Sequence, residues 1–221
     1  MSAPANTRPP SRALLDRLAP LREVDGLPGL LAHQALDPIG LWQAWEDEAG
    51  SVMPPPFWAT VWPAAVVLAR CLRGGVVPVA GRRVLEVGCG GAVVAIAAAL
   101  AGAGSVEAND LDPVGLDIAA RNAHANGVSL RSTTTDYSSA ARLPGCDLVL
   151  AADLFYERTA SARLLDRLRS ARHAGTEVVL ADAGRPFAPA AGVELIRSET
   201  LAVDVGLEGV ATRTVRVMRL R

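Results

Sequence analysis

The residues most able to do chemistry are a glycine-rich turn, G-C-G-G at Gly88–Gly91, and Asp110, which follows about twenty positions later. The turn comes after the apolar stretch Val84–Val87 and before an alanine-rich run, as in a strand that turns sharply into a helix. Backbone N–H groups at such a turn can bind polar ligands, and a carboxylate at the end of the next strand can bind ribose hydroxyls. The pattern predicts a cofactor that contains a nucleoside.

The glycine spacing disfavours an NAD site. NAD-binding turns usually read G-x-G-x-x-G, whereas Val93 stands where the third glycine would fall. A tight turn without any ligand is the alternative interpretation, and the position of Asp110 argues against it.

Further candidates follow the later apolar runs, because ligands of parallel sheets bind where strands end. Asp136 could accept a hydrogen bond from an adenine amino group, or it could cap a turn, and Tyr137 could stack on the same ring. After the run at 147–151, Asp153 and Tyr156 would face the reacting groups. Asp153 could instead cap the following helix.

Trp62 precedes a proline at an expected helix start and could cover a cationic cofactor, because an aromatic face attracts a cation. Core packing is the alternative role. His33, His124 and His173 share no spacing typical of a metal site, so we expect no metal.

Apolar runs alternate with helical segments through the middle of the chain, which predicts a parallel, doubly wound sheet. The expected strands are 83–87, 105–109, 129–134, 147–151, 176–181, 193–203 and 211–220, the last two forming an antiparallel hairpin, and the expected helices are 64–72, 92–102, 113–125 and 159–173. The predicted fold class is α/β and Rossmann-like, with seven strands and an N-terminal helical cap.

The chain of 221 residues suits one domain. We expect residues 1–25 to be disordered or partly helical and residues 26–221 to form the domain, with a cap over 26–80.

Composition narrows the function classes. A net charge of −1 gives no support for a nucleic-acid partner, and the Ala92–Ala101 run is too short to span a membrane. The chain contains no lysine, which is typical of a GC-rich genome and excludes lysine automethylation. Three cysteines without metal-ligand spacing and no visible signal peptide predict a cytoplasmic protein, which we expect to be bacterial.

Several segments match one family in order: PPFWATVWPAAVVLARCL, VLEVGCGGAVVAIAA, ANDLDP, RNAHANGV, DLVLAADLFYE and ADAGRPF. The E-x-G-x-G run at Glu86–Gly90 resembles motif I of class I S-adenosylmethionine (SAM) methyltransferases. Together the segments resemble the electron-transfer-flavoprotein β-subunit lysine methyltransferases, one group of the seven-β-strand protein-lysine methyltransferases.

The resemblance implies the seven-stranded class I fold, SAM as cofactor and S-adenosylhomocysteine as product. It implies a cofactor site made by Trp62, Glu86, Gly88, Cys89, Gly90, Asp110, Leu111, Asp136, Tyr137 and Ala152. Asp153 and Tyr156 match the family's D-x-x-Y run on the acceptor side. We therefore expect Asp153 to hold an incoming lysine ammonium and Tyr156 to orient the amine.

The chain departs from the family near the acceptor side, with Ala64 and Ala65 after W-P and with A-D-A-G-R in place of G-D-P-G-R. The implied partner is a protein with an accessible lysine, such as the electron transfer flavoprotein β subunit, or a small amine. A small-molecule N- or O-methyltransferase and a non-catalytic SAM-binding module remain the alternatives.

Overall fold

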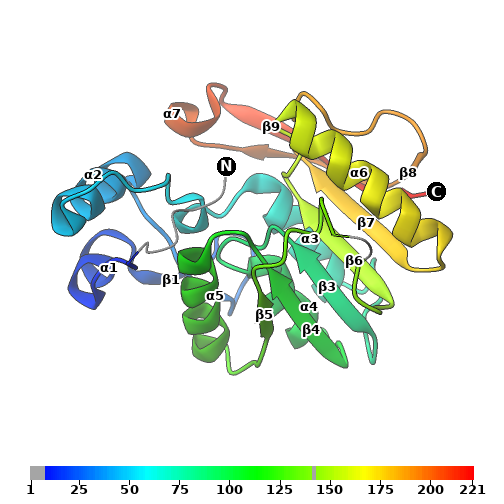
Figure 1. Cartoon of the computed structure of the whole chain (residues 1–221), viewed down its shortest axis with the longest axis horizontal. Coiled ribbons are helices and arrows are strands. Elements are labelled where there is room, and N and C mark those ends of the chain that lie inside the picture. Colours follow the sequence, from blue (N-terminus) through cyan, green and yellow to red (C-terminus); the bar gives the residue numbers. More distant parts are fainter. Residues whose placement is uncertain (1–7, 141–142) are drawn as a thin grey trace.

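A seven-stranded sheet forms the centre of the computed structural model, which describes residues 8–140 and 143–221 (Figure 1). Its order is β5-β4-β3-β6-β7-β9-β8, and β9 runs antiparallel to both of its neighbours. The strands are β3 (Arg83–Val87), β4 (Ser105–Asn109), β5 (Arg131–Thr133), β6 (Leu148–Ala152), β7 (Glu177–Asp182), β8 (Val193–Ala202) and β9 (Thr212–Leu220). The predicted fold class is confirmed, although β5 is shorter than the expected strand over 129–134.

The register aligns the carboxyl ends of the central strands. Val87 lies opposite Asn109 of β4 and opposite Ala151 of β6, and Ala152 lies opposite Ala181 of β7. The segments that follow these residues therefore meet at one edge of the sheet, which we call the strand-end edge.

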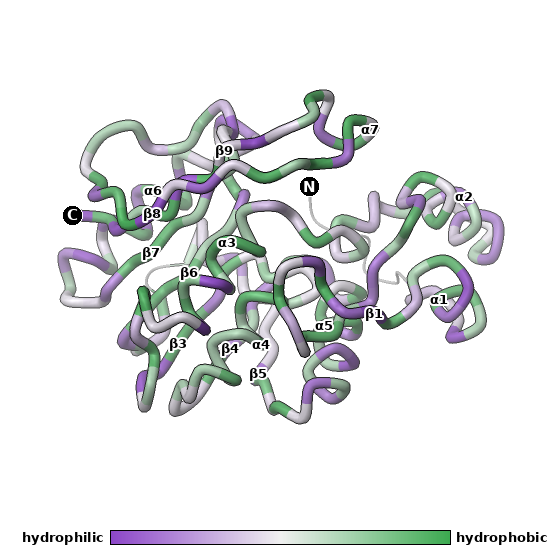
Figure 2. The backbone as a smooth tube through the Cα atoms, turned by 180° about the vertical axis from the view of Figure 1, so that it is seen from behind, coloured by the Kyte–Doolittle hydropathy of each residue, from purple (hydrophilic) through white to green (hydrophobic). Residues whose placement is uncertain are grey.

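Helices cover both faces of the sheet because successive strand residues point to opposite sides. Val84 packs in one hydrophobic cluster with α3 (Pro63–Arg73), α4 (Val93–Leu100) and α5 (Pro113–Ala125). Leu85 packs in a second cluster with α6 (Arg158–His173). Figure 2 shows apolar residues running through the central strands and polar residues gathered on outer helices and loops. Strands buried on both faces have the near-continuous apolar sequences that made them predictable.

The described part of the N-terminal segment, residues 8–25, contains a helix and a short strand. Residues 1–7 lie outside the described residues, but residues 8–25 contribute α1 (Arg12–Leu18) and β1 (Leu21–Glu23). β1 pairs with β2 (Leu31–His33) in a hairpin that the sequence did not predict, and α2 (Pro38–Ala49) follows. Leu14 and Leu15 are buried in a cluster with Trp45 and Trp58. Burial of these side chains explains why the segment is folded.

The connection between β8 and β9 contains a four-residue helix, α7 (Val205–Glu208), which was also not expected. α1 and α2 lie at the opposite side of the molecule from β8 and α6 (Figure 1). No helix in the described part of the chain is long and apolar enough to cross a bilayer.

Candidate active site

The glycine turn leaves the end of β3 in a conformation that favours glycine. Gly88 and Gly90 have φ angles of 67° and 50°. A Cβ on Gly88 would overlap the Leu154 side chain. Asp110, directly after β4, accepts a 2.7 Å hydrogen bond from the Gly90 N–H. The structure therefore brings together the turn and the carboxylate that the sequence singled out.

Asp110 stands at the strand-end edge with one oxygen on the glycine turn and the other accepting the Asp112 N–H at 3.0 Å. Burial raises the pKa of Asp110 above its usual value, although backbone N–H donors counteract the rise. Leu111 follows with 49% of its surface exposed. A carboxylate beside an exposed apolar side chain suits a ligand with both hydroxyl groups and a flat ring.

Glu86 and Cys89 face inward. Glu86 is buried beneath the first turn of α4, where its Oε2 accepts the Ala95 N–H at 2.7 Å, and burial raises its pKa to about 8. Cys89 is buried, its N–H donates to the Asn109 carbonyl, and burial raises the pKa of its thiol. Both residues hold the turn in place, and the structure gives neither side chain a position facing the strand-end edge.

The side chains of Asp136 and Tyr137 lie in different surroundings, although the two residues are adjacent in sequence. Asp136 is exposed and accepts hydrogen bonds from Ser138 and Ser139, which is the turn-capping role considered as its alternative. Tyr137 packs in the cluster on the α6 face, and its hydroxyl donates to Glu107 Oε1 at 2.8 Å. The Tyr137 ring therefore packs in the core, and its stacking on adenine stays a prediction.

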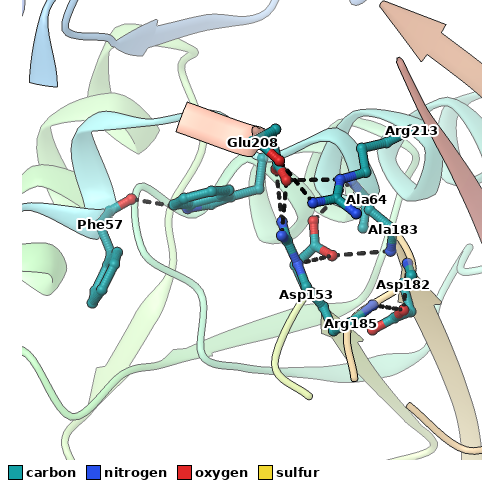
Figure 3. Close-up of polar contacts among 10 residues, drawn as sticks. Phe57, Ala64, Asp153, Asp182, Ala183, Arg185, Glu208 and Arg213 are labelled. Carbon is teal, nitrogen blue, oxygen red and sulfur yellow. Dashed lines mark hydrogen bonds and ion pairs between the residues drawn. The ribbon is translucent and has the colours of Figure 1, made fainter. Parts of the chain in front are cut away.

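Asp153 lies at the centre of a polar network just beyond Ala152, the half-buried last residue of β6 (Figure 3). Its φ angle is 56°, and only 6% of its surface is exposed. Oδ2 accepts the Ala64 N–H at 3.2 Å, and Oδ1 accepts the Ala183 N–H at 3.0 Å and Arg185 Nε at 3.1 Å. Asp153 thus caps the first turn of α3 from outside that helix, while Glu157 caps the helix that follows Asp153.

Arg185 joins Asp153 to the β8–β9 connection. Its two terminal nitrogens donate to both oxygens of Glu208 at 2.9 and 2.8 Å, and Arg213 donates to the same carboxylate at 2.9 Å (Figure 3). Asp182, at the end of β7, accepts the backbone N–H of Arg185 and thereby holds this segment. We call Asp153, Arg185, Glu208 and Arg213 the Asp153 network. Sequence reasoning missed Glu208, because it lies in a short connection without apolar periodicity.

Three aromatic side chains stand beside the Asp153 network, and we call Phe57, Trp62 and Tyr156 the aromatic cluster. The Phe57 ring centroid lies 6.2 Å from that of Trp62 and 6.3 Å from that of Tyr156. Trp62 Nε1 donates to the Phe57 carbonyl at 3.2 Å (Figure 3), and the Arg185 guanidinium lies 5.4 Å from the Trp62 ring centroid. Phe57 and Tyr156 are 55% and 59% exposed, which is unusual for large aromatic residues.

Asn122 supports the glycine turn from α5 and was not predicted. It is fully buried, its Nδ2 donates to the Gly91 carbonyl, and its Oδ1 accepts the His33 N–H. Asn122 belongs to the segment RNAHANGV, which was quoted for the family resemblance. An amide on the apolar face of an expected helix was the signal in the sequence that could have identified it, because a buried amide needs hydrogen-bond partners. Among residues 8–140 and 143–221, no group of three or more His, Cys, Asp or Glu side chains is placed to hold a metal ion.

This chain is similar to several known methyltransferases. A family model described as ribosomal protein L11 methyltransferase (PrmA) matches residues 75–155. The electron transfer flavoprotein beta subunit lysine methyltransferase of Danio rerio is 38% identical over 133 residues, which is 60% of this chain and 52% of that protein. The protein N-lysine methyltransferase METTL21A of Danio rerio is 35% identical over 130 residues, covering 55% of this chain and 59% of that protein.

The chain spans about half of the length of the flavoprotein-directed relatives that it matches. Among solved structures, the 16S rRNA methyltransferase RsmC of Thermus thermophilus, in complex with AdoMet and guanosine, aligns with a TM-score of 0.54 at 17% identity. That alignment covers 76% of this chain and 46% of RsmC, and at this identity it concerns the fold alone.

Proposed function

Because the chain has the class I methyltransferase fold and is related in sequence to the electron transfer flavoprotein beta subunit lysine methyltransferases, we propose that it transfers a methyl group from SAM to a protein lysine side chain. The observation that carries the proposal is the meeting of two features at the strand-end edge. One is the glycine turn bound by Asp110, and the other is the exposed aromatic cluster next to the Asp153 network.

The residues present fit SAM. The glycine turn places backbone groups beside Asp110, which retains lone pairs for ribose hydroxyls beyond its two N–H donors. Leu111 offers an exposed apolar surface for the adenine ring. Ala152 and Trp62 remain in the proposed cofactor site, whereas Glu86 and Cys89 act from behind the turn.

When bound, SAM would supply a methyl group on an electrophilic sulfonium, so the protein has mainly to align the acceptor and exclude water. A lysine amine attacks only as the neutral base. Partial burial, together with the nearby charges of Asp110 and Glu157, raises the pKa of Tyr156, so its phenol stays protonated at neutral pH. The phenol oxygen of Tyr156 can accept a hydrogen bond from an N–H of the amine, which orients the amine and leaves its lone pair free, while the proton leaves to water.

The proposed acceptor is a lysine of the electron transfer flavoprotein β subunit or of another protein, by analogy with the flavoprotein-directed relatives. The chain itself has no lysine, so a labelled band at its own mass cannot arise from lysine automethylation. We also keep a cytoplasmic location as part of the proposal, because Cys71, Cys89 and Cys146 are all free thiols.

The test is calorimetric titration with S-adenosylhomocysteine, followed by transfer of a tritiated methyl group into purified electron transfer flavoprotein and into host lysate. Binding together with label on a protein lysine supports the proposal, and the labelled band identifies the acceptor. Label confined to the small-molecule fraction would replace it with a small-molecule methyltransferase. Binding without transfer to either fraction would favour a non-catalytic module, and no binding would remove the cofactor.

A further inference from the structure

Asp153 has little capacity left to receive a lysine ammonium. Its two oxygens already accept three N–H donors, from Ala64, Ala183 and Arg185, at 3.0–3.2 Å. Its side chain is almost fully buried, and the charge of Arg185 neutralises it. A carboxylate in this position stabilises the surrounding backbone and contributes little attraction for a second cation. The expectation that Asp153 holds the ammonium directly is therefore not supported by its contacts.

The contacts of Asp153 instead hold Trp62 in position. Trp62 is the residue directly before α3, and Asp153 accepts the Ala64 N–H in the first turn of that helix. Asp153 also holds Arg185, whose guanidinium lies against the Trp62 ring. Asp153 thus fixes Trp62 both through the backbone of α3 and through Arg185.

The aromatic cluster provides what Asp153 does not. Phe57 and Tyr156 are more than half exposed, and Phe57 links Tyr156 to Trp62 through ring contacts of 6.3 and 6.2 Å. Aromatic faces attract ammonium groups, and the attraction persists when methyl groups replace the N–H donors. The Arg185 guanidinium, 5.4 Å from the Trp62 ring centroid, already makes a cation–π contact of this kind. Asp110 and Glu157 add negative potential near Tyr156.

We propose that Phe57, Trp62 and Tyr156 form a clamp for the ammonium and aliphatic stem of the acceptor side chain, and that Asp153 is a positioning residue for this clamp. The proposal rests on the proposed function, since it assigns the acceptor-binding part of that site. The ligand class is a primary or methylated alkylammonium. The ring contacts tolerate each successive methylation of the amine because they need no N–H donor, whereas the hydrogen bond to Tyr156 is available only while the amine keeps an N–H.

A binding experiment tests the clamp without any catalysis. The four tryptophans give separate indole N–H signals in an ¹⁵N spectrum, and a Trp62→Phe variant identifies the Trp62 signal. The wild-type chain is titrated with choline and with 3,3-dimethyl-1-butanol, its neutral isostere. We expect choline to shift the Trp62 signal at several-fold lower concentration than the alcohol does. Equal responses to the two ligands, or no saturable shift with choline, would overturn the clamp.

Variants then separate the clamp from a general apolar surface. Phe57→Leu and Tyr156→Leu should each weaken choline binding and raise KM for the protein acceptor by about five- to tenfold, with S-adenosylhomocysteine affinity unchanged. Phe187→Leu is the matched control, because Phe187 also has an arginine at its ring but lies outside the cluster. Unchanged KM in both cluster variants would refute the proposal.

The positioning role of Asp153 has a separate readout. Asp153→Asn should move the Trp62 indole signal of the free protein, because Arg185 and the start of α3 lose their charged partner. An unmoved free-protein signal together with a raised KM would overturn the positioning role. If the wild-type chain binds S-adenosylhomocysteine but transfers no methyl group, the proposed function fails, while the choline titration still decides whether the clamp exists.

Discussion

The side chain of Asn122 holds the carbonyl of Gly91 with a 2.9 Å hydrogen bond from Nδ2. Its Oδ1 accepts the His33 N–H at 2.8 Å, so one buried amide links the glycine turn, α5 and the N-terminal hairpin. Through this link, the N-terminal hairpin supports the glycine turn from behind.

Asn122→Ala should lower the free energy of unfolding by about 2–4 kcal/mol, because two backbone groups lose their buried partner. It should also weaken S-adenosylhomocysteine binding, since the Gly91 carbonyl is no longer fixed. Urea unfolding and calorimetry measure the two effects. Asn126→Ala is the control, because Asn126 pairs with Leu31 of the same hairpin but does not touch the turn. Equal losses of cofactor affinity in the two variants would contradict a specific role for Asn122.

Gly88→Ala should destabilise the fold by about 3 kcal/mol, through left-handed backbone strain and overlap with Leu154. The double variant Gly88→Ala/Leu154→Ala separates these causes, because it removes the overlap and keeps the strain of about 1–2 kcal/mol. Thermal unfolding of the wild type and the three variants gives the coupling energy. Strict additivity of the two changes would show that Leu154 does not limit the turn.

Glu86 should make the protein less stable as the pH rises from about 4.5 to about 8. Burial raises its pKa from 4.5 to about 8, so in this window the native state holds a proton that the unfolded state has released. The free energy of unfolding therefore falls with pH until native Glu86 also ionises. Burial also raises the pKa of Asp182, to about 6, which acts in the same direction.

Glu86→Gln should remove most of this slope, because the amide stays neutral and can still accept the Ala95 N–H. At pH 8 the variant should exceed the wild type in stability by about 2–4 kcal/mol, and at pH 5 the two should be similar. Urea titrations at pH 5, 6.5 and 8 measure the slopes. Parallel slopes in the two proteins would mean that native Glu86 is ionised at neutral pH.

Glu208→Gln should cost about 3 kcal/mol of stability, because Arg185 and Arg213 lose a buried carboxylate. It should also raise KM for the acceptor, since Arg185 is then held against Trp62 by Asp153 alone. Glu199→Gln is the matched control. Glu199 lies on the partly exposed β8 and pairs with Arg197 of the same strand and with Arg70 of α3. Its substitution should lower the free energy of unfolding by less than about 1 kcal/mol. If the two substitutions changed KM equally, Glu208 would have no specific role in acceptor binding.

The sheet and its helices could be predicted because the central strands β3, β4, β6 and β7 are mostly buried and their apolar runs alternate with helical segments. α5 matches the expected 113–125, with Pro113 at its first turn and Asp112 as its cap. The β1–β2 hairpin escaped prediction because each strand has only three residues, too few for a period to show.

The structure brings together the glycine turn and Asp110, which the sequence singled out, and it differs from the sequence-based expectations where side-chain direction decides. The glycine turn and Asp110 depend on local geometry that sequence spacing records. Tyr137 was expected at the ligand because it follows an expected strand and has a ring that can stack, and the structure places its side chain on the α6 face of the sheet. Glu208 lies in the β8–β9 connection and binds Arg185, which precedes β8. No local sequence pattern encodes a contact between residues so far apart in the chain.

The position of β9 has a consequence for synthesis on the ribosome. β9 inserts between β7 and β8, and Glu208 and Arg213 flank its beginning. The glycine turn and Asp110 emerge much earlier, so a growing chain can form the proposed nucleoside-binding part before α7, which supplies Glu208 to Arg185, exists. We expect a nascent chain to acquire affinity for the cofactor first and the Glu208 contact that holds Arg185 against Trp62 last, so the acceptor clamp reaches its final geometry only after α7 has been made.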